Sequence, residues 1–354
     1  MINPYYFFHK IHDLDNLLLA YKKAHKGKTR KSYVIKFERD LERNLLDLQF
    51  EIKNQFYKLQ PLKKFILHDP KTRTISVSDF RDRVVHHAII NITGPMFEKS
   101  FIYDSCANQK GKGNLFAIKR FEKFMKKVSR NGTKNSLIYP NHVKGHCFKA
   151  DIKHYFQEID LEILLSTIQR KIKDKKVMWL IKKIVSGGGG EGSQTQKGMP
   201  LGNLTSQFFA NVYLNELDYY VKHVLKVKYY LRYVDDFAIL HVSHEQLSTW
   251  KNQINEFLKE NLKLELHPQK SRIIRFSRGI DFVGFRISYH HKLLRKRNLK
   301  AMKKKIELYS KGAMCFSDAK KSYDGWNTYA HWANTHKLRK NTKRKIIDVL
   351  WEKI

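Results

Sequence analysis

The chain has 354 residues, of which 42% are hydrophobic and 13% aromatic, and it carries 69 Lys and Arg against 33 Asp and Glu. This apolar content excludes a disordered chain, and the length is sufficient for a core divided over two or three lobes. The net charge of +36 favours nucleic acid as the partner over an anionic membrane, because so many like charges repel one another without a bound polyanion.

The sequence predicts neither a membrane anchor nor a disulfide framework. No window approaches the ~18–20 uncharged apolar residues of a membrane span. The N-terminal segment has charged residues, such as Asp13 and Asp15, where a secretory leader would have its apolar centre. Cys106, Cys147 and Cys315 lack CxxC spacing, which indicates a reducing cytoplasm and excludes a typical structural zinc site.

The N-terminal part of the chain is predicted to be helical around one hairpin. Apolar residues at i, i+3 and i+4 predict helices over residues 1–60, with Asp13 as an N-cap. Alternating residues around Pro-Lys-Thr predict a hairpin over 63–77, and helical patterns continue to about 128.

The rest of the chain mixes strands and helices. "GHCFKADIKHYF" predicts a strand that is followed by helices to about 185, and the glycine-rich segment 186–198 predicts a loop without a P-loop pattern. A helix over 200–225, a strand pair over 228–241, a helix over 244–262, short strands around 264–288 and basic helices follow. The fold class predicted from this order is α+β.

Three aspartates within apolar strands form the main functional signal. Asp235 and Asp236 interrupt "KYYLRYVDDFAILH", where a tight turn would place both at the tip of a hairpin. Asp151 ends another apolar strand, which could bring its carboxylate beside them. Clustered carboxylates repel one another unless divalent cations neutralise them, and Mg²⁺ prefers such oxygen ligands. Two ions at one site would support phosphoryl transfer. Asp151 alone would more often be a turn residue, but adjacent aspartates with apolar flanks on both sides fit a solvent turn poorly.

The motifs resemble those of reverse transcriptases, in the order that this family has. "YVDD" and "FKADIKHYF" resemble two palm motifs, and "DPKTRTISVSDFRDRVVHHAI" resembles the fingers hairpin with its helix. "GMPLGNLTSQFFANVYLNELD", "LELHPQKSRI" and "GIDFVGFRI" resemble the template loop, the lysine motif and the primer-grip hairpin. The resemblance implies a right-hand polymerase, with N-terminal helices and fingers over 1–145, a palm over 146–290 and a basic helical thumb over 291–354.

The resemblance also implies roles for individual residues. Two Mg²⁺ ions, or Mn²⁺ in their place, would be held by Asp151, Asp235, Asp236 and the backbone carbonyl of Ile152. Lys71, Arg73 and Lys270 would neutralise the triphosphate of a dNTP. Phe156 would exclude a ribose 2′-hydroxyl, although a core aromatic explains this residue as well. The implied substrates and partners are dNTPs, a structured template RNA, the nascent cDNA, and a small accessory protein or a second polymerase subunit.

One motif departs from the usual pattern of the family. The template loop reads Leu201-Gly202-Asn203-Leu204-Thr205-Ser206-Gln207, whereas the family usually begins it with Gln-Gly and ends it with Ser-Pro. This variant resembles bacterial and phage reverse transcriptases of diversity-generating retroelements, which copy a template RNA with errors at adenines. It also resembles the reverse transcriptases of antiphage defence, and the residues alone do not separate these two roles.

The C-terminal part is strongly basic. Nine Lys or Arg lie in the segment from Lys292 to Lys311, both included, and six more lie in "KLRKNTKRK" (337–345). Tyr323, Trp326, Tyr329 and Trp332, spaced by three, predict the core stripe of a helical thumb. The following residues are predicted to bind nucleic acid in the thumb and the primer grip: Phe282, Gly284, Lys296, Arg297, Lys303, Lys304 and Lys305.

Three activities therefore compete for this sequence. RNA-directed DNA polymerisation is the prediction that the motifs favour, and the intact Asp151, Asp235, Asp236 and Lys270 argue against an inactive RNA-binding scaffold. A DNA-templated or template-free polymerase on the same palm is the third possibility.

Overall fold

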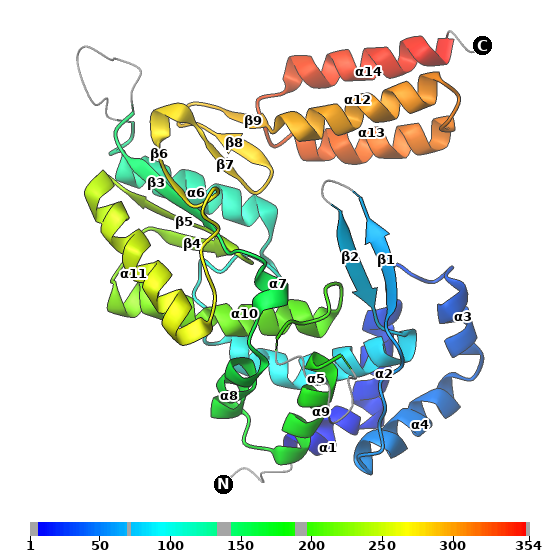
Figure 1. Cartoon of the computed structure of the whole chain (residues 1–354). Coiled ribbons are helices and arrows are strands. Elements are labelled where there is room, and N and C mark those ends of the chain that lie inside the picture. Colours follow the sequence, from blue (N-terminus) through cyan, green and yellow to red (C-terminus); the bar gives the residue numbers. More distant parts are fainter. Residues whose placement is uncertain (1–5, 69–71, 133–142, 188–196, 352–354) are drawn as a thin grey trace. The chain divides into compact units, whose positions relative to one another are not determined.

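The computed structural model describes residues 6–68, 72–132, 143–187 and 197–351. The chain forms two compact units, and each is assembled from three separate segments (Figure 1). The first unit contains Met1–Lys110, Asp151–Lys228 and Asn252–Pro268, and the second contains Gly111–Ala150, Tyr229–Lys251 and Gln269–Ile354. Both units are mixed, and every strand pairing whose direction is defined is antiparallel, so the predicted α+β class is confirmed.

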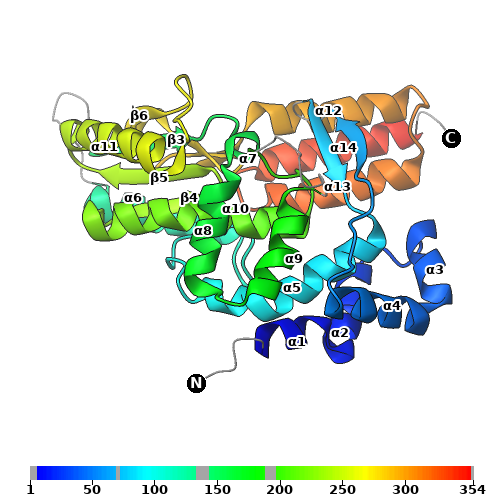
Figure 2. The same ribbon diagram turned by 60° about the horizontal axis from the view of Figure 1, so that its bottom comes forward.

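The first unit is mostly helical. Its helices are α1 (Tyr6–His12), α2 (Leu14–His25), α3 (Ser32–Arg39), α4 (Leu41–Lys53), α5 (Phe80–Glu98), α7 (Tyr155–Glu158), α8 (Leu161–Lys171), α9 (Lys175–Val185) and α10 (Leu204–Tyr219), which a π-helical turn over Tyr220–Val224 prolongs. The buried helix α5 packs against α1, α2 and α10, while α8 and α9 pack against α10 (Figure 2). The hairpin of β1 (Lys63–Leu67) and β2 (Arg73–Val77) confirms the predicted one.

Aspartate caps explain why several of these helices begin where they do. The side chain of Asp13 accepts a hydrogen bond from the backbone N–H of Asp15, as the sequence predicts for the start of α2. Asp79, Asp160 and Asp174 cap α5, α8 and α9 in the same way.

The second unit contains two sheets. The strands β3 (His146–Asp151), β4 (Tyr230–Tyr233), β5 (Asp236–His241) and β6 (Arg272–Arg275) form a sheet in the order β4-β5-β3-β6. A smaller antiparallel sheet consists of β7 (Ile280–Phe282), β8 (Phe285–Ile287) and β9 (Lys292–Leu294). Helix α6 (Asn114–Val128) packs against β4 and β5. Of the residues in these two sheets, only Asp151, the last residue of β3, is assigned to the first unit.

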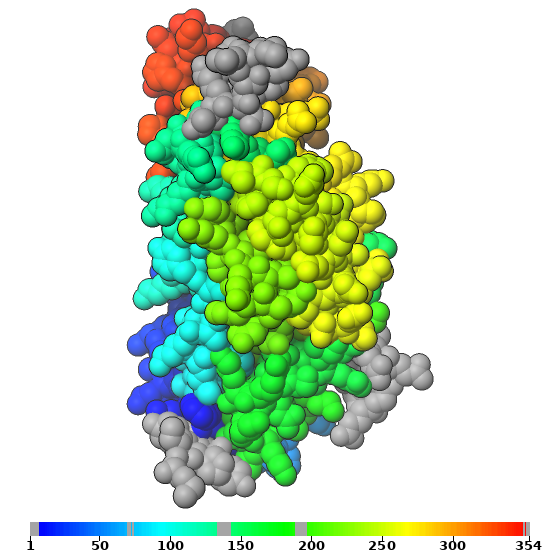
Figure 3. Space-filling view, turned by 90° about the vertical axis from the view of Figure 1, so that its left-hand side faces the viewer, coloured from blue at the N-terminus to red at the C-terminus, as the bar shows by residue number. Residues whose placement is uncertain are grey.

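Helix α11 (His244–Leu262) begins in the second unit and ends in the first, so that its residues are divided between them. Its Leu247, Ile254 and Leu258 are buried, and its outer side is exposed (Figure 3). These bounds match the predicted amphipathic helix over 244–262.

Three helices complete the second unit: α12 (Lys296–Ser310), α13 (Phe316–Ala330) and α14 (His336–Trp351). Their shared core contains Met302, Tyr309, Ala319 and Ile346. Tyr323 and Trp326 pack against this core as predicted, but the rest of the aromatic stripe does not. Tyr329 packs against Phe285 of β8, and Trp332 lies beyond the last residue of α13 and is 38% exposed.

No helix in the described part of the chain is long and apolar enough to cross a membrane. The predicted partition into residues 1–145, 146–290 and 291–354 stays a prediction.

Candidate active site

The two adjacent aspartates lie at the tip of a buried hairpin, as predicted. Tyr233 pairs with Asp236 across β4 and β5, so Val234 and Asp235 form a two-residue turn. The flanking Phe237, Ala238 and Ile239 are completely buried, which fixes both strands on α6. Val234 has a φ of 57°, a left-handed conformation that a β-branched residue rarely adopts. Such strain costs about 1–3 kcal/mol and persists only where the surroundings hold it in place.

A buried arginine forms a hydrogen bond to this turn. Arg232 is completely buried in β4, and its Nη1 donates a hydrogen bond of 3.0 Å to the carbonyl oxygen of Val234. Because a charged donor in a dry environment forms a strong hydrogen bond, Arg232 can hold the strained peptide that precedes Asp235. No motif in the sequence indicates this role for Arg232.

Lys149 of the neighbouring strand β3 balances the charge of Asp236. Its Nζ lies 3.4 Å from Oδ1 of Asp236, and only 16% of the lysine side chain is exposed. Asp151 follows Lys149 by two positions and is the last residue of β3. Since alternate residues of a strand point to the same side, β3 directs Lys149 and Asp151 toward one face of the sheet. The backbone carbonyl of Asp151 accepts a hydrogen bond of 2.7 Å from the N–H of His267.

The described residues contain no group of three or more His, Cys, Asp or Glu side chains that is already arranged to hold a metal ion. The chemistry of the donors nevertheless fits a hard divalent cation, because Asp235, Asp236 and Asp151 offer only carboxylate oxygens. The Lys149 ammonium already places a positive charge beside one of these carboxylates, that of Asp236.

The residues after β3 make a sharp turn into α7. His154 is left-handed, with a φ of 46°, and Ile152 is buried and forms a β-bridge with Leu266. The hydroxyl of Tyr155 donates to the carbonyl of Ala210 at 2.5 Å. The adjacent Phe156 is half-buried, and its carbonyl accepts a hydrogen bond of 2.9 Å from the N–H of Met199. The aromatic ring of Phe156 is therefore partly accessible, as a substrate contact requires.

The template loop and the fingers hairpin contact each other within the first unit. The N–H of Ser76 in β2 donates to the carbonyl of Leu201 at 2.9 Å, and the N–H of Ser78 donates to the side chain of Asn203 at 3.2 Å. Gly202 has a φ of 122°, and a Cβ there would lie 2.9 Å from Cγ2 of Ile75. This close approach explains why glycine occupies the position. The contact of the buried Asn203 amide is likewise not indicated by any motif in the sequence.

The structure describes only part of the predicted phosphate site. Lys71 lies outside the described residues, and the side chain of Arg73, the first residue of β2, does too. Lys270 is half-buried. It lies two positions before Arg272 of β6, which pairs with Lys149 of β3. Gln207 lies in the first turns of α10, where it is half-buried.

The predicted primer-grip hairpin has a second strained turn. Val283 has a φ of 44° and Gly284 a φ of 86° between β7 and β8. A Cβ on Gly284 would lie 2.1 Å from the hydroxyl of Tyr329, so only glycine fits beneath this ring. Burial raises the pKa of Tyr329, which keeps its hydroxyl protonated. The Phe282 side chain is 1% exposed and stacks on Phe121, so its ring supports the hairpin from the interior and is not offered to a nucleic acid.

The predicted basic residues of α12 are exposed. These residues are Lys296, Arg297, Lys303, Lys304 and Lys305. Lys305 contacts the hydroxyl of Ser322 on α13 at 3.3 Å. The remaining side chains present their charges to solvent, as contacts with phosphates require.

Comparisons with known proteins identify the family. The profile described as "Reverse transcriptase (RNA-dependent DNA polymerase)" matches residues 62–287, which is more than half of the chain and contains all three hairpins described above and the template loop. The COX1/OXI3 intron 2 protein of Saccharomyces cerevisiae is 23% identical over 342 residues, which cover 77% of this chain and 38% of that protein. The group II intron-encoded protein LtrA of Lactococcus lactis subsp. cremoris is 24% identical over 324 residues, which cover 72% of this chain and 51% of LtrA.

A solved structure supports the same fold. The telomerase of Candida albicans, determined with a fragment of telomeric RNA, superimposes with a TM-score of 0.52 and 11% identity, over 84% of this chain and 56% of that one. This likeness confirms the right-hand polymerase fold. The chain spans about half or less of the length of the two intron-encoded relatives. From the family profile and the motifs within it, we conclude that the chain belongs to the reverse transcriptase (RNA-dependent DNA polymerase) family.

Proposed function

We propose that this protein is an RNA-directed DNA polymerase. The observation that carries the proposal is the buried hairpin whose strained turn presents Asp235 and Asp236 next to β3, the strand that ends in Asp151. A rigid hairpin is what a site of this kind needs, because phosphoryl transfer depends mainly on positioning and on charge stabilisation.

Asp151, Asp235 and Asp236, with the backbone carbonyl of Ile152, would hold two Mg²⁺ ions. When bound, such ions lower the pKa of the primer 3′-hydroxyl and stabilise the departing pyrophosphate. The chain itself would orient the reactants. Lys270 would bind the triphosphate together with Lys71 and Arg73 of the fingers.

The fingers hairpin and the template loop would form the surface for the nascent base pair. The hydrogen bonds from Ser76 to Leu201 and from Ser78 to Asn203 couple the two segments. Phe156, with its partly accessible ring, would lie against the sugar of the incoming nucleotide and exclude a 2′-hydroxyl.

Primer extension tests this proposal. The wild type is expected to extend a primer on an RNA template with dNTPs and Mg²⁺, and Asp235→Asn with Asp236→Asn is expected to abolish extension while RNA binding persists. Asp324→Asn, an exposed aspartate of α13, is the matched control. Extension on a DNA template alone would favour a DNA-templated polymerase, and no synthesis on any template would favour the RNA-binding scaffold.

We further propose that the biological role is error-prone copying of a dedicated structured RNA in a diversity-generating retroelement. Support comes from Leu201 and Gln207, which resemble that group. Leu201 stands where the family usually has glutamine, so an amide is missing from the surface near the nascent base pair. A looser base pair would lower fidelity. Leu201→Gln is expected to reduce misincorporation opposite adenine, and an identical error spectrum in sequenced products would refute this role for Leu201. Gene neighbours that encode a toxin or a second polymerase would favour antiphage defence.

A further inference from the structure

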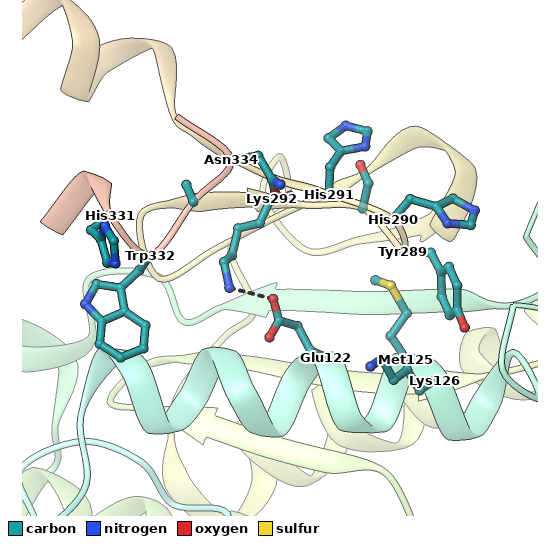
Figure 4. A pocket seen from close by; sticks show the side chains of 12 residues that line it. Glu122, Met125, Lys126, Tyr289, His290, His291, Lys292, His331, Trp332 and Asn334 are labelled. Carbon is teal, nitrogen blue, oxygen red and sulfur yellow. Dashed lines mark hydrogen bonds and ion pairs between the residues drawn. The ribbon is translucent and has the colours of Figure 1, made fainter. Parts of the chain in front are cut away.

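A polar cavity of about 360 Å³ lies within the second unit, and none of its lining residues is among those assigned above to polymerisation (Figure 4). Three segments line it: helix α6, the turn between β8 and β9, and the segment that follows α13. Its size is in the range of pockets that bind small molecules and cofactors.

Specific contacts hold the wall of this cavity in place. The N–H of Lys292 donates to Oδ1 of Asn334 at 2.8 Å, and the N–H of Asn334 donates to the carbonyl of Lys292 at 2.8 Å. The ammonium of Lys292 also forms a 2.6 Å ion pair with Glu122 of α6, and only 16% of the lysine side chain is exposed. The three segments are thus joined through one residue, so the cavity is preformed.

The lining combines aromatic rings with positive charge. Trp332, Tyr289, His290, His291 and His331 contribute rings from two of the segments. Trp332 is 38% exposed, and Nζ of Lys119 lies 5.5 Å from the centre of its ring. Lys126 adds a cation, whereas the carboxylate of Glu122 is already neutralised by Lys292.

This composition selects among ligand classes. A divalent cation is disfavoured, because the described residues hold no suitable group of ligands and Lys126 leaves a positive charge in the lining after Lys292 pairs with Glu122. An apolar ligand would find mainly polar side chains. A nucleobase that carries a phosphate satisfies the lining, because its face can stack on Trp332 or Tyr289 and its phosphate can approach Lys126.

We propose that this cavity binds an unpaired nucleotide of a single-stranded nucleic acid. Only an unpaired base exposes a face for stacking, so a duplex would not enter the site. The occupant could come from RNA, from single-stranded DNA or from a free nucleotide, since all three share the base and the phosphate. The proposal does not depend on polymerase activity.

Fluorescence anisotropy with the full-length protein tests the assignment. The probes are a labelled single-stranded RNA, a DNA of the same sequence, the RNA annealed to its complement, and unlabelled nucleoside monophosphates as competitors. Trp332→Ala is expected to weaken binding of at least one single-stranded probe about tenfold, which is a typical loss for one base stacked on an aromatic ring. The single-stranded probe that is affected identifies the source of the nucleotide, and competition by monophosphates alone would identify a free nucleotide.

Further variants separate loss of stacking from loss of folding. Trp332→Phe keeps a ring and is expected to restore most of the affinity, while Trp351→Ala, another exposed tryptophan of the same unit, is expected to have no such effect. RNA that contains 5-bromouridine is expected to crosslink to Trp332 or Tyr289 upon irradiation, also in the Asp235→Asn variant. Unchanged affinity of Trp332→Ala for every single-stranded probe and for the monophosphates, an equal loss for the duplex, or crosslinks confined to other segments would each overturn the proposal.

Discussion

Replacing Arg232 by methionine should disturb the turn that carries Asp235 without removing any carboxylate. Methionine fills similar space but cannot donate to the carbonyl of Val234, which Arg232 contacts at 3.0 Å. Because Arg232 is completely buried, water cannot replace the lost donor.

The expected magnitude follows from two terms. A hydrogen bond from a charged donor contributes about 1.5–3 kcal/mol, and the left-handed Val234 opposes it with about 1–3 kcal/mol of strain. Without Arg232 the strain is no longer offset, so the turn should relax in a large fraction of molecules. We expect the free energy of unfolding to fall by about 2–3 kcal/mol, and kcat to fall at least about tenfold, because ~1.4 kcal/mol corresponds to one decade in a population.

Urea unfolding and steady-state primer extension measure the two quantities. KM for dNTPs should change much less than kcat, because Arg232 is not among the residues predicted to bind the dNTP triphosphate. Val234→Gly permits the left-handed conformation without strain, so in the double variant it should restore part of the lost kcat. The reasoning is refuted if Arg232→Met leaves kcat unchanged, or if Val234→Gly affects the wild type and the Arg232→Met background equally.

Three further predictions address other parts of the chain. Gly202→Ala forces a Cβ to within 2.9 Å of Ile75 and should reduce primer extension at least about tenfold. Gly27→Ala is the control, because Gly27 also has a positive φ but has no atom near its Cβ position, and it should leave primer extension unchanged. Equal activities of the two variants would contradict the close approach at Gly202. Burial lowers the pKa of His86 to about 3, so the unfolded state binds more protons below pH 6.5, and this residue alone should reduce the free energy of unfolding by about 2 kcal/mol near pH 5. In urea unfolding, His86→Leu should lessen the loss of stability between pH 7 and pH 5 by that amount, and the rest should include the share of His87, whose pKa burial lowers to about 4. An equal loss in His86→Leu and in the wild type would contradict this assignment. Replacing Lys303, Lys304 and Lys305 by alanine should weaken single-stranded RNA binding and reduce its log–log salt slope by up to about two, and an unchanged slope would disprove phosphate contacts by α12.

The active-site hairpin could be predicted because its signal is local. A two-residue turn between apolar strands fixes the register, and therefore the places of Asp235 and Asp236. Arg232 and Lys149 could not be predicted, because a charged residue in a strand ordinarily faces solvent and only the folded sheet reveals their partners.

Non-local contacts limited the rest of the prediction. The expected strands around 264–288 divide into β6, which pairs with β3, and β7 and β8, which join a different sheet with β9. A local pattern does not encode such a choice of partner. The aromatic stripe failed at Trp332 because α13 ends at Ala330, and helical spacing has no meaning beyond the end of a helix.

The assembly of each compact unit from three segments has a consequence for synthesis. The first unit lacks its last segment until Pro268 has been synthesised. In the second unit, Gly111–Ala150 cannot pack against the last segment until the residues from Gln269 onward have been synthesised. Neither unit can therefore complete its fold early on the ribosome, and contacts between distant segments slow folding. A nascent chain that ends before residue 268 would expose unfinished apolar surfaces in both units. Its solubility at that stage would depend on chaperones or on the repulsion between its many like charges.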